Sequence, residues 1–95
     1  MTTYMVFTRL KTTDQATLEE YFKQGPGTAD GHDVTIHAAY GAHAVVEGPS
    51  HEGMVILSFP TREAALAWYD GDEYRRVRQL RFQGAEYQVT IVPGA

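Results

Sequence analysis

The feature that most constrains the fold is an apolar strand that runs directly into a capped helix. Residues 54–59 (Met-Val-Ile-Leu-Ser-Phe) are apolar on both faces, as is typical of a strand that is covered on both sides. A proline follows, and Thr61 can accept hydrogen bonds from the first amides of an Ala-rich helix. Gly71 breaks this helix, and apolar residues three apart predict a further helix up to Gln83. The segment therefore predicts a strand followed by two helices.

Three more elements are predicted on either side of this segment. Period-two alternation predicts strands over residues 4–10 and 86–92. Thr12 and Gln15 match a capping box, so we expect a first helix to begin there. Residues 25–27 (Gly-Pro-Gly) end it, because they supply a left-handed cap residue and then a proline that cannot continue the helix.

The segment between the first helix and residue 54 carries mixed signals. Residues 34–36 (Val-Thr-Ile) favour a strand, whereas 37–39 (His-Ala-Ala) are also compatible with the end of a helix. We expect extended chain with a bulge or bend at Gly41, and residues 42–47 as the firmer part of this strand. Residues 48–53 then form a loose turn into the next strand.

The resulting order, β-α-β-β-α-β, predicts one ferredoxin-like domain over residues 1–95. This α+β fold has a four-stranded antiparallel sheet with the helices on one face. Strands 4–10 and 54–59 are apolar on both sides, so the second face of the sheet needs a cover. A second copy of the chain, packed sheet to sheet, supplies it, and we expect a homodimer through the sheet face.

The charge balance and composition exclude several classes of protein. A formal charge of −4 argues against general affinity for nucleic acid. Zero cysteines exclude a disulfide framework, and no apolar run reaches the roughly 18 residues of a membrane span, so we expect a cytoplasmic protein. Five arginines nevertheless cluster in one segment, either as a solvated helix face or as an anion-binding face for a carboxylated ligand: Arg62, Arg75, Arg76, Arg78 and Arg81.

Several short motifs resemble domain-of-unknown-function family 1330 of the dimeric α+β-barrel superfamily. They are Phe59-Pro60-Thr61 with Ala64-Ala65, Trp68-Tyr69, Tyr74, Arg81, Tyr40-Gly41-Ala42-His43 and Glu47-Gly48. The resemblance covers essentially the whole chain and implies a ferredoxin-like protomer and a dimer. Relatives in the superfamily range from cofactor-free monooxygenases to regulatory ligand-binding domains, and we expect no cofactor. Many members of the family carry Gly-Gly followed by Arg or Lys where this chain has Gly41-Ala42-His43.

His43 is the best single candidate for acid–base chemistry. An imidazole exchanges protons near neutral pH, and the resemblance places His43 on the second strand. Glu47 is a candidate partner, although four strand residues separate the two by about 13 Å. The alternative is a half-buried sheet histidine with a hydrogen-bonded ring. The other three histidines form no closely spaced pair with His43 or with one another, so we expect no metal site.

Three residues downstream are candidate ligand-binding groups. Trp68 is more often a core or interface aromatic than a ligand contact. Tyr74 can donate a phenolic hydrogen bond into a cavity, although its apolar stripe favours packing. Arg81 lies further along the same helix and can hold a carboxylate with two hydrogen bonds, with a salt bridge as its default role.

These residues lead to two hypotheses. The first is a protein that binds a small aromatic or carboxylated metabolite in a pocket between sheet and helices, or a cofactor-independent enzyme that acts on one. In that hypothesis His43 carries protons and Arg81 anchors an anion. The second is a non-catalytic dimerisation or ligand-sensing module in which the aromatic side chains are all structural.

Overall fold

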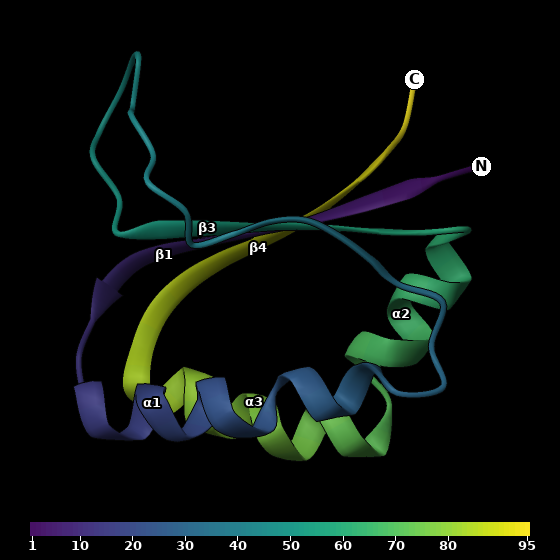
Figure 1. The fold of residues 1–95 in the computed structure, drawn as a ribbon, viewed down its shortest axis with the longest axis horizontal. Helices are drawn as coiled ribbons and strands as arrows, with labels where there is room; N and C mark the ends of the chain where they lie inside the picture. The colour runs from purple at the N-terminus through teal and green to yellow at the C-terminus, as the bar shows by residue number, and fades with distance from the viewer.

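All residues from Met1 to Ala95 are described by the computed structural model, which places every helix on one side of a single sheet (Figure 1). The elements are β1 (Thr3–Thr12), α1 (Gln15–Gln24), the short 3-10 helix η1 (Pro26–Ala29), β2 (Thr35–Ala39), β3 (Gly53–Phe59), α2 (Arg62–Tyr69), α3 (Asp72–Gly84) and β4 (Ala85–Pro93). No helix is long and apolar enough to cross a membrane.

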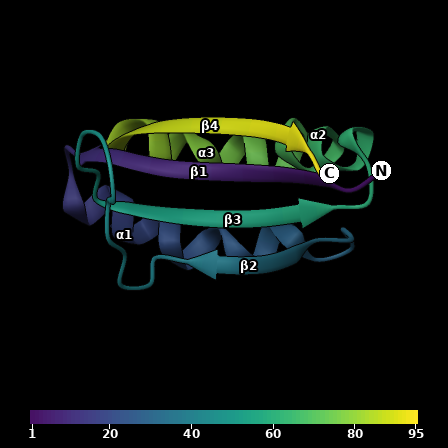
Figure 2. The ribbon, with the colours of Figure 1, turned by 90° about the horizontal axis from the view of Figure 1, so that it is seen from above.

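The strands lie in the order β2-β3-β1-β4, and every neighbouring pair is antiparallel (Figure 2). This is the ferredoxin-like arrangement, so the predicted α+β fold class is confirmed. The two helix-bearing crossovers bring β1 and β3 to the centre of the sheet. These central strands supply the residues that support the helices.

Alternation along the central strands separates a helix-facing side from an open side. Met5 and Phe7 of β1 are buried, and their partners on β3 are Leu57 and Val55. Trp68 packs on this side, with its ring stacked 5.7 Å from that of Phe59. The core therefore lies between the sheet and the helices.

Two of the predicted helix starts can be compared with the observed caps. The Thr61 hydroxyl accepts a hydrogen bond from the amide of Ala64 at 3.0 Å, which confirms the cap of α2. The first helix is capped by Asp14, whose carboxylate accepts from the Thr17 amide, and not by Thr12 as predicted. Thr12 still belongs to β1, and its hydroxyl instead donates to Glu52 at 2.6 Å.

The end of α1 also differs from the prediction. Gly25 has a right-handed backbone (φ −59°), and its amide makes a helical hydrogen bond to the carbonyl of Tyr21 at 2.8 Å. The chain then tightens into η1 without a left-handed cap. Pro26 is tolerated here because it occupies the first turn of η1.

The expectation of a strand over residues 42–47 was wrong. β2 ends at Ala39, and Tyr40 has a left-handed backbone with φ 55°. Such a backbone is uncommon outside glycine and turns the chain away from the sheet, so the bend lies at Tyr40 and not at Gly41. Residues 41–52, called the arm below, then project from the open side before β3 begins (Figure 1).

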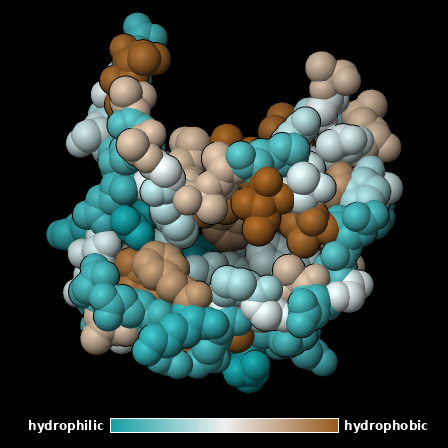
Figure 3. Space-filling model, viewed as in Figure 1, coloured by the Kyte–Doolittle hydropathy of each residue, from teal (hydrophilic) through white to brown (hydrophobic).

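The open face of the sheet is concave. The arm rises at one end and the two chain termini rise at the other, with hydrophobic side chains at the base of the hollow between them (Figure 3). Val6 and Ile56 lie opposite each other on this face and are only half-buried, whereas Val46 in the arm is 97% exposed. The polar residues Gln88 and Thr90 of β4 are exposed on the same face.

Candidate functional site

A cavity of about 330 Å³ lies on the helix-facing side, between the sheet, α1 and η1. Fourteen residues line it and twelve of them are hydrophobic. β1 and β3 contribute Phe7, Val55 and Leu57 to the walls, while α1 contributes Phe22. This size and lining are typical of a site for a small apolar ligand.

Two tyrosine hydroxyls provide polar atoms at this cavity. Tyr21 on α1 and Tyr74 on α3 both line it, and their hydroxyl oxygens are 2.6 Å apart. The two helices pack closely because α3 ends in Gly84, where a Cβ would lie 2.8 Å from the backbone nitrogen of Leu18. The close packing of the helices thus holds the hydroxyl pair in place.

Both hydroxyls are protonated at neutral pH, and burial moves their pKa values still higher. Desolvation raises the pKa of Tyr21, and the neighbouring Tyr74 adds to the rise. Desolvation also raises the pKa of Tyr74, although the positive charge of Arg81 opposes this effect. At neutral pH the pair therefore presents phenol groups and no base.

Trp68 forms another wall of the cavity and is held from two sides. Its indole N–H donates to the Thr28 hydroxyl in η1 at 3.1 Å, and that hydroxyl donates to the carbonyl of Gly25 at 2.6 Å. Its ring stacks on Tyr74 with the centroids 4.1 Å apart. The short helix η1 therefore orients the tryptophan against the hydroxyl pair.

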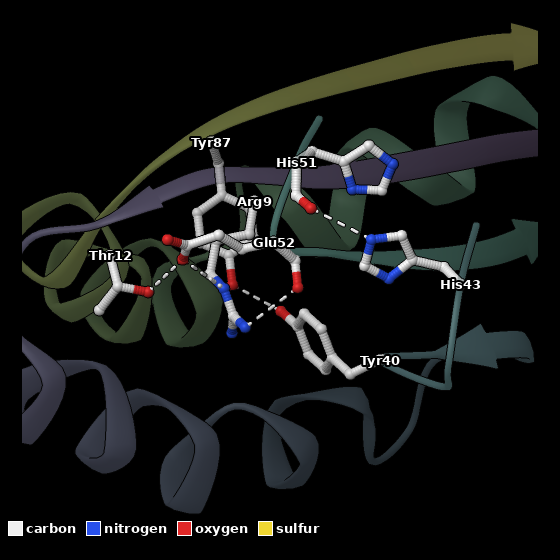
Figure 4. Close-up of polar contacts among 7 residues, drawn as sticks. All are labelled: Arg9, Thr12, Tyr40, His43, His51, Glu52 and Tyr87. Carbon is white, nitrogen blue, oxygen red and sulfur yellow. Dashed lines mark hydrogen bonds and ion pairs between the residues drawn. The ribbon is translucent and has the colours of Figure 1, made fainter. Parts of the chain in front are cut away.

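Tyr40 lines the cavity beside the base of the arm (Figure 4). Its hydroxyl lies 2.6 Å from that of Tyr87, and the guanidinium of Arg9 is 5.1 Å from its ring centre. The ring also packs on Gly53, where a Cβ would lie 2.8 Å from a Tyr40 ring carbon. These contacts stabilise the left-handed backbone of Tyr40 and keep its ring against the cavity.

A polar network supports Arg9 at this end of the cavity. The Nε atom of Arg9 is 3.3 Å from Oε1 of Glu52, and the same oxygen accepts from Thr12 (Figure 4). The Thr12 hydrogen bond, with Arg9 adding to it, lowers the pKa of Glu52. Arg9 is therefore a paired cation.

Arg81 on α3 is buried next to the cavity without an acidic partner. Only 3% of the residue is exposed, and its Nη2 donates to the Tyr69 hydroxyl at 3.2 Å. Its guanidinium carbon lies 5.5 Å from the ring centre of Phe7, a residue of the cavity wall. The positive charge is thus close to the cavity but does not line it.

The candidate residues from the sequence fall into two groups. Trp68 and Tyr74 line the cavity, and Arg81 lies behind them in contact with Tyr69. His43 and Glu47 lie in the exposed arm and do not line the cavity. The geometry therefore does not bring the proposed proton carrier together with the proposed ligand contacts.

His43 is not on a strand, contrary to the expectation from the resemblance. Its Nε2 lies 3.1 Å from the backbone oxygen of His51, and the two rings stack with centroids 4.5 Å apart (Figure 4). The remaining histidines do not join them, and no group of three His, Asp or Glu side chains is placed to hold a metal ion.

The sequence interpretation missed Tyr21, Tyr40 and Tyr87 as site residues. Tyr21 falls within the predicted first helix and Tyr87 within the strand predicted over residues 86–92, and neither position by itself indicates a site. The composition nevertheless contains a signal for such pairs. The chain has six tyrosines, and any that are buried need a hydrogen-bond partner for the hydroxyl.

Comparison with known proteins gives a family and a fold. A family model described as "Domain of unknown function (DUF1330)" matches residues 2–95. No curated protein matches the chain. A protein of unknown function from Rhodopseudomonas palustris is similar in structure, with a TM-score of 0.77 and 13% identity over 99% of this chain and 82% of that one.

Two further solved structures carry functional descriptions. A putative antibiotic biosynthesis monooxygenase from Nitrosomonas europaea has a TM-score of 0.63 and 15% identity, over 99% of this chain and 98% of that one. SnoaB, a cofactor-independent oxygenase from Streptomyces nogalater, has a TM-score of 0.56 and 8% identity, over 99% and 91%. At these identities the likeness shows only that the chains share an α+β fold.

Proposed function

This chain belongs to the DUF1330 family, whose description assigns no activity, and we propose from its cavity that the protein binds a small aromatic molecule between the sheet and α1. The observation that carries the proposal is the hydrophobic cavity of about 330 Å³ with Trp68, Phe7 and Phe22 in its walls. Flat ligands gain stacking energy from such rings in addition to apolar burial.

The side chains at the cavity favour binding over acid–base catalysis. No His, Asp, Glu or Lys lines it. Its tyrosine hydroxyls are protonated at neutral pH as ordinary phenols are, and burial raises the pKa values of Tyr21, Tyr40 and Tyr74 further. The cavity walls thus offer no general base at neutral pH, and the catalytic role expected for His43 has no geometric support.

We expect at least one compound from a panel of one- and two-ring aromatic compounds to bind with a Kd in the micromolar range, measured by isothermal titration calorimetry. The substitution Ala29→Phe places a ring in the cavity wall and should abolish this binding. Ala16→Phe makes the same change at an exposed position of α1 and should leave the Kd within about twofold. Failure of every compound to bind, or equal binding by both variants, would refute the proposal.

We also propose that a second copy of the chain covers the open face of the sheet. The chain exposes 5930 Å², whereas a monomer of its mass typically exposes about 5,500 Å². The excess agrees with a concave apolar face and a projecting arm that have no partner within one chain (Figure 3). In a twofold dimer the same apolar residues of each copy would contact those of the other and cover both faces.

The substitution Val6→Asp is expected to convert the dimer to a monomer. Val6 lies between Ile56 and Thr90 on the open face, so the carboxylate would be buried without a partner in the dimer. Light scattering at micromolar concentration should give twice 10.6 kDa for the unmodified protein and 10.6 kDa for the variant. Gln79→Asp, on the exposed side of α3, should remain dimeric. A monomeric unmodified protein would contradict the proposal.

A further inference from the structure

We propose that the ligand of the cavity is an aromatic carboxylate, whose carboxylate accepts a hydrogen bond from the Tyr21–Tyr74 hydroxyl pair and supplies the missing counter-charge of Arg81. This inference rests on the proposed function, since it names the chemical class of the molecule that the cavity binds. Three observations carry it: an unpaired buried cation, a hydroxyl proton without an acceptor, and cavity walls without negative charge.

The first observation is the environment of Arg81. The partly buried Arg9 and Arg78 pair with Glu52 and Asp70, at 3.3 and 3.1 Å, but Arg81 has no carboxylate within ion-pair distance. Arg81 is the most buried of the three, and only its charge lacks a carboxylate partner, although the Nε atom is without a hydrogen-bond partner in all three. A buried cation without a counter-ion is costly, so an anion nearby is strongly favoured.

Aromatic rings compensate Arg81 only in part. The guanidinium carbon lies 5.0 Å from the ring centres of both Phe82 and Tyr87, and 5.5 Å from that of Phe7. Each such contact offsets only part of the cost of taking the charge out of water, and none of the three rings carries a negative charge. The side chain is therefore held in place beside the cavity with its charge incompletely balanced.

The second observation is the hydroxyl pair, which connects Arg81 to the cavity. Tyr74 and Tyr21 have two hydroxyl protons and use one of them between themselves at 2.6 Å. The other proton has no acceptor among the protein groups. Arg81 favours negative charge at this position, as its opposing effect on the raised pKa of Tyr74 indicates. The free hydroxyl proton therefore favours a ligand that presents an anionic acceptor oxygen over a ligand that presents another hydrogen-bond donor.

The third observation is that nothing in the cavity walls repels an anion. No Asp or Glu lines the cavity. The walls beyond the hydroxyls are apolar and aromatic, with Trp68 stacked on Tyr74. A flat ring system against these walls with one carboxylate at the hydroxyl pair satisfies both parts of the site.

Calorimetric titration with 2-naphthoate and 2-naphthamide tests the inference, because the two compounds differ chiefly in charge. We expect the unmodified protein to bind the carboxylate at least tenfold more tightly than the amide. Arg81→Met keeps a long apolar side chain and removes the charge, so it should reduce this ratio to about one while still binding the amide. Arg78→Met, on the same helix but paired with Asp70, should keep the ratio.

Tyr21→Phe provides a second variant, which retains Arg81, in case Arg81→Met does not fold. It removes one hydroxyl of the pair and should lower the preference for the carboxylate several-fold. Equal affinity for the two compounds, or tighter binding of the amide, in the unmodified protein would overturn the inference and leave the proposed function intact. If neither these nor the other aromatic compounds bind, the proposed function itself fails.

Discussion

The substitution Trp68→Ala is expected to lower the free energy of unfolding by about 3–5 kcal/mol, the range measured for deleting large aromatic side chains from protein cores. Only 6% of Trp68 is exposed, and its ring stacks on Tyr74 and Phe59 with the centroids 4.1 and 5.7 Å apart. Its removal also leaves the Thr28 hydroxyl without the indole donor. Small domains are typically stable by about 5–15 kcal/mol, so the variant should be close to unfolding at room temperature.

Chemical denaturation followed by circular dichroism measures this loss, at one protein concentration for all variants because an oligomer gains stability with concentration. Trp68→Phe keeps an aromatic ring in the stack and is the matched comparison, with a smaller expected loss. An unfolding free energy for Trp68→Ala within about 1 kcal/mol of the unmodified protein would show that Trp68 does not organise the core as described.

The second large effect is expected at the buried hydroxyl pair. Tyr21→Phe or Tyr74→Phe alone should cost about 1–3 kcal/mol, since each leaves the other hydroxyl buried without its partner. The double variant removes both groups and should cost clearly less than the sum of the two. A double-mutant cycle by chemical denaturation measures this coupling, and strictly additive losses would contradict the described contact.

The same pair predicts how stability changes at alkaline pH. Burial raises the pKa of Tyr21 in the folded protein above the unfolded value of about 10. The extra stability is therefore fully present below pH 10 and decreases as pH rises further, because only the unfolded state then releases the proton. Tyr21→Phe should make this decrease less steep.

The order of the elements could be predicted because local signals agree with the tertiary structure. The residues around Thr61 specify a helix start through hydrogen bonds within one turn, and these bonds are present. Met5 and Phe7 alternate with outward residues, and this alternation matches their pairing with β3. The cap of α1 was mispredicted because a long-range contact decides it: the Thr12 hydroxyl donates to Glu52, and Asp14 caps the helix instead.

The candidate site was less predictable, because its contacts join residues that are distant in sequence. The hydroxyls of Tyr21 and Tyr74 meet across 53 residues, and those of Tyr40 and Tyr87 across 47. Periodicity shows that such residues face the core but not which of them touch. The expected strand position of His43 was wrong for a related reason, since contacts with β1, β3 and β4 stabilise the left-handed turn at Tyr40 that takes the chain out of the sheet.

The central claim, that the cavity is the ligand site, is tested most directly by one nuclear magnetic resonance signal. Trp68 is the only tryptophan, so the protein has a single indole N–H resonance, and that N–H donates to Thr28 from a residue that lines the cavity. Saturation with 2-naphthoate is predicted to shift this resonance, together with amides of α1 and η1. An unmoved indole signal, with shifts confined to the arm or to the open face of the sheet, would contradict the claim.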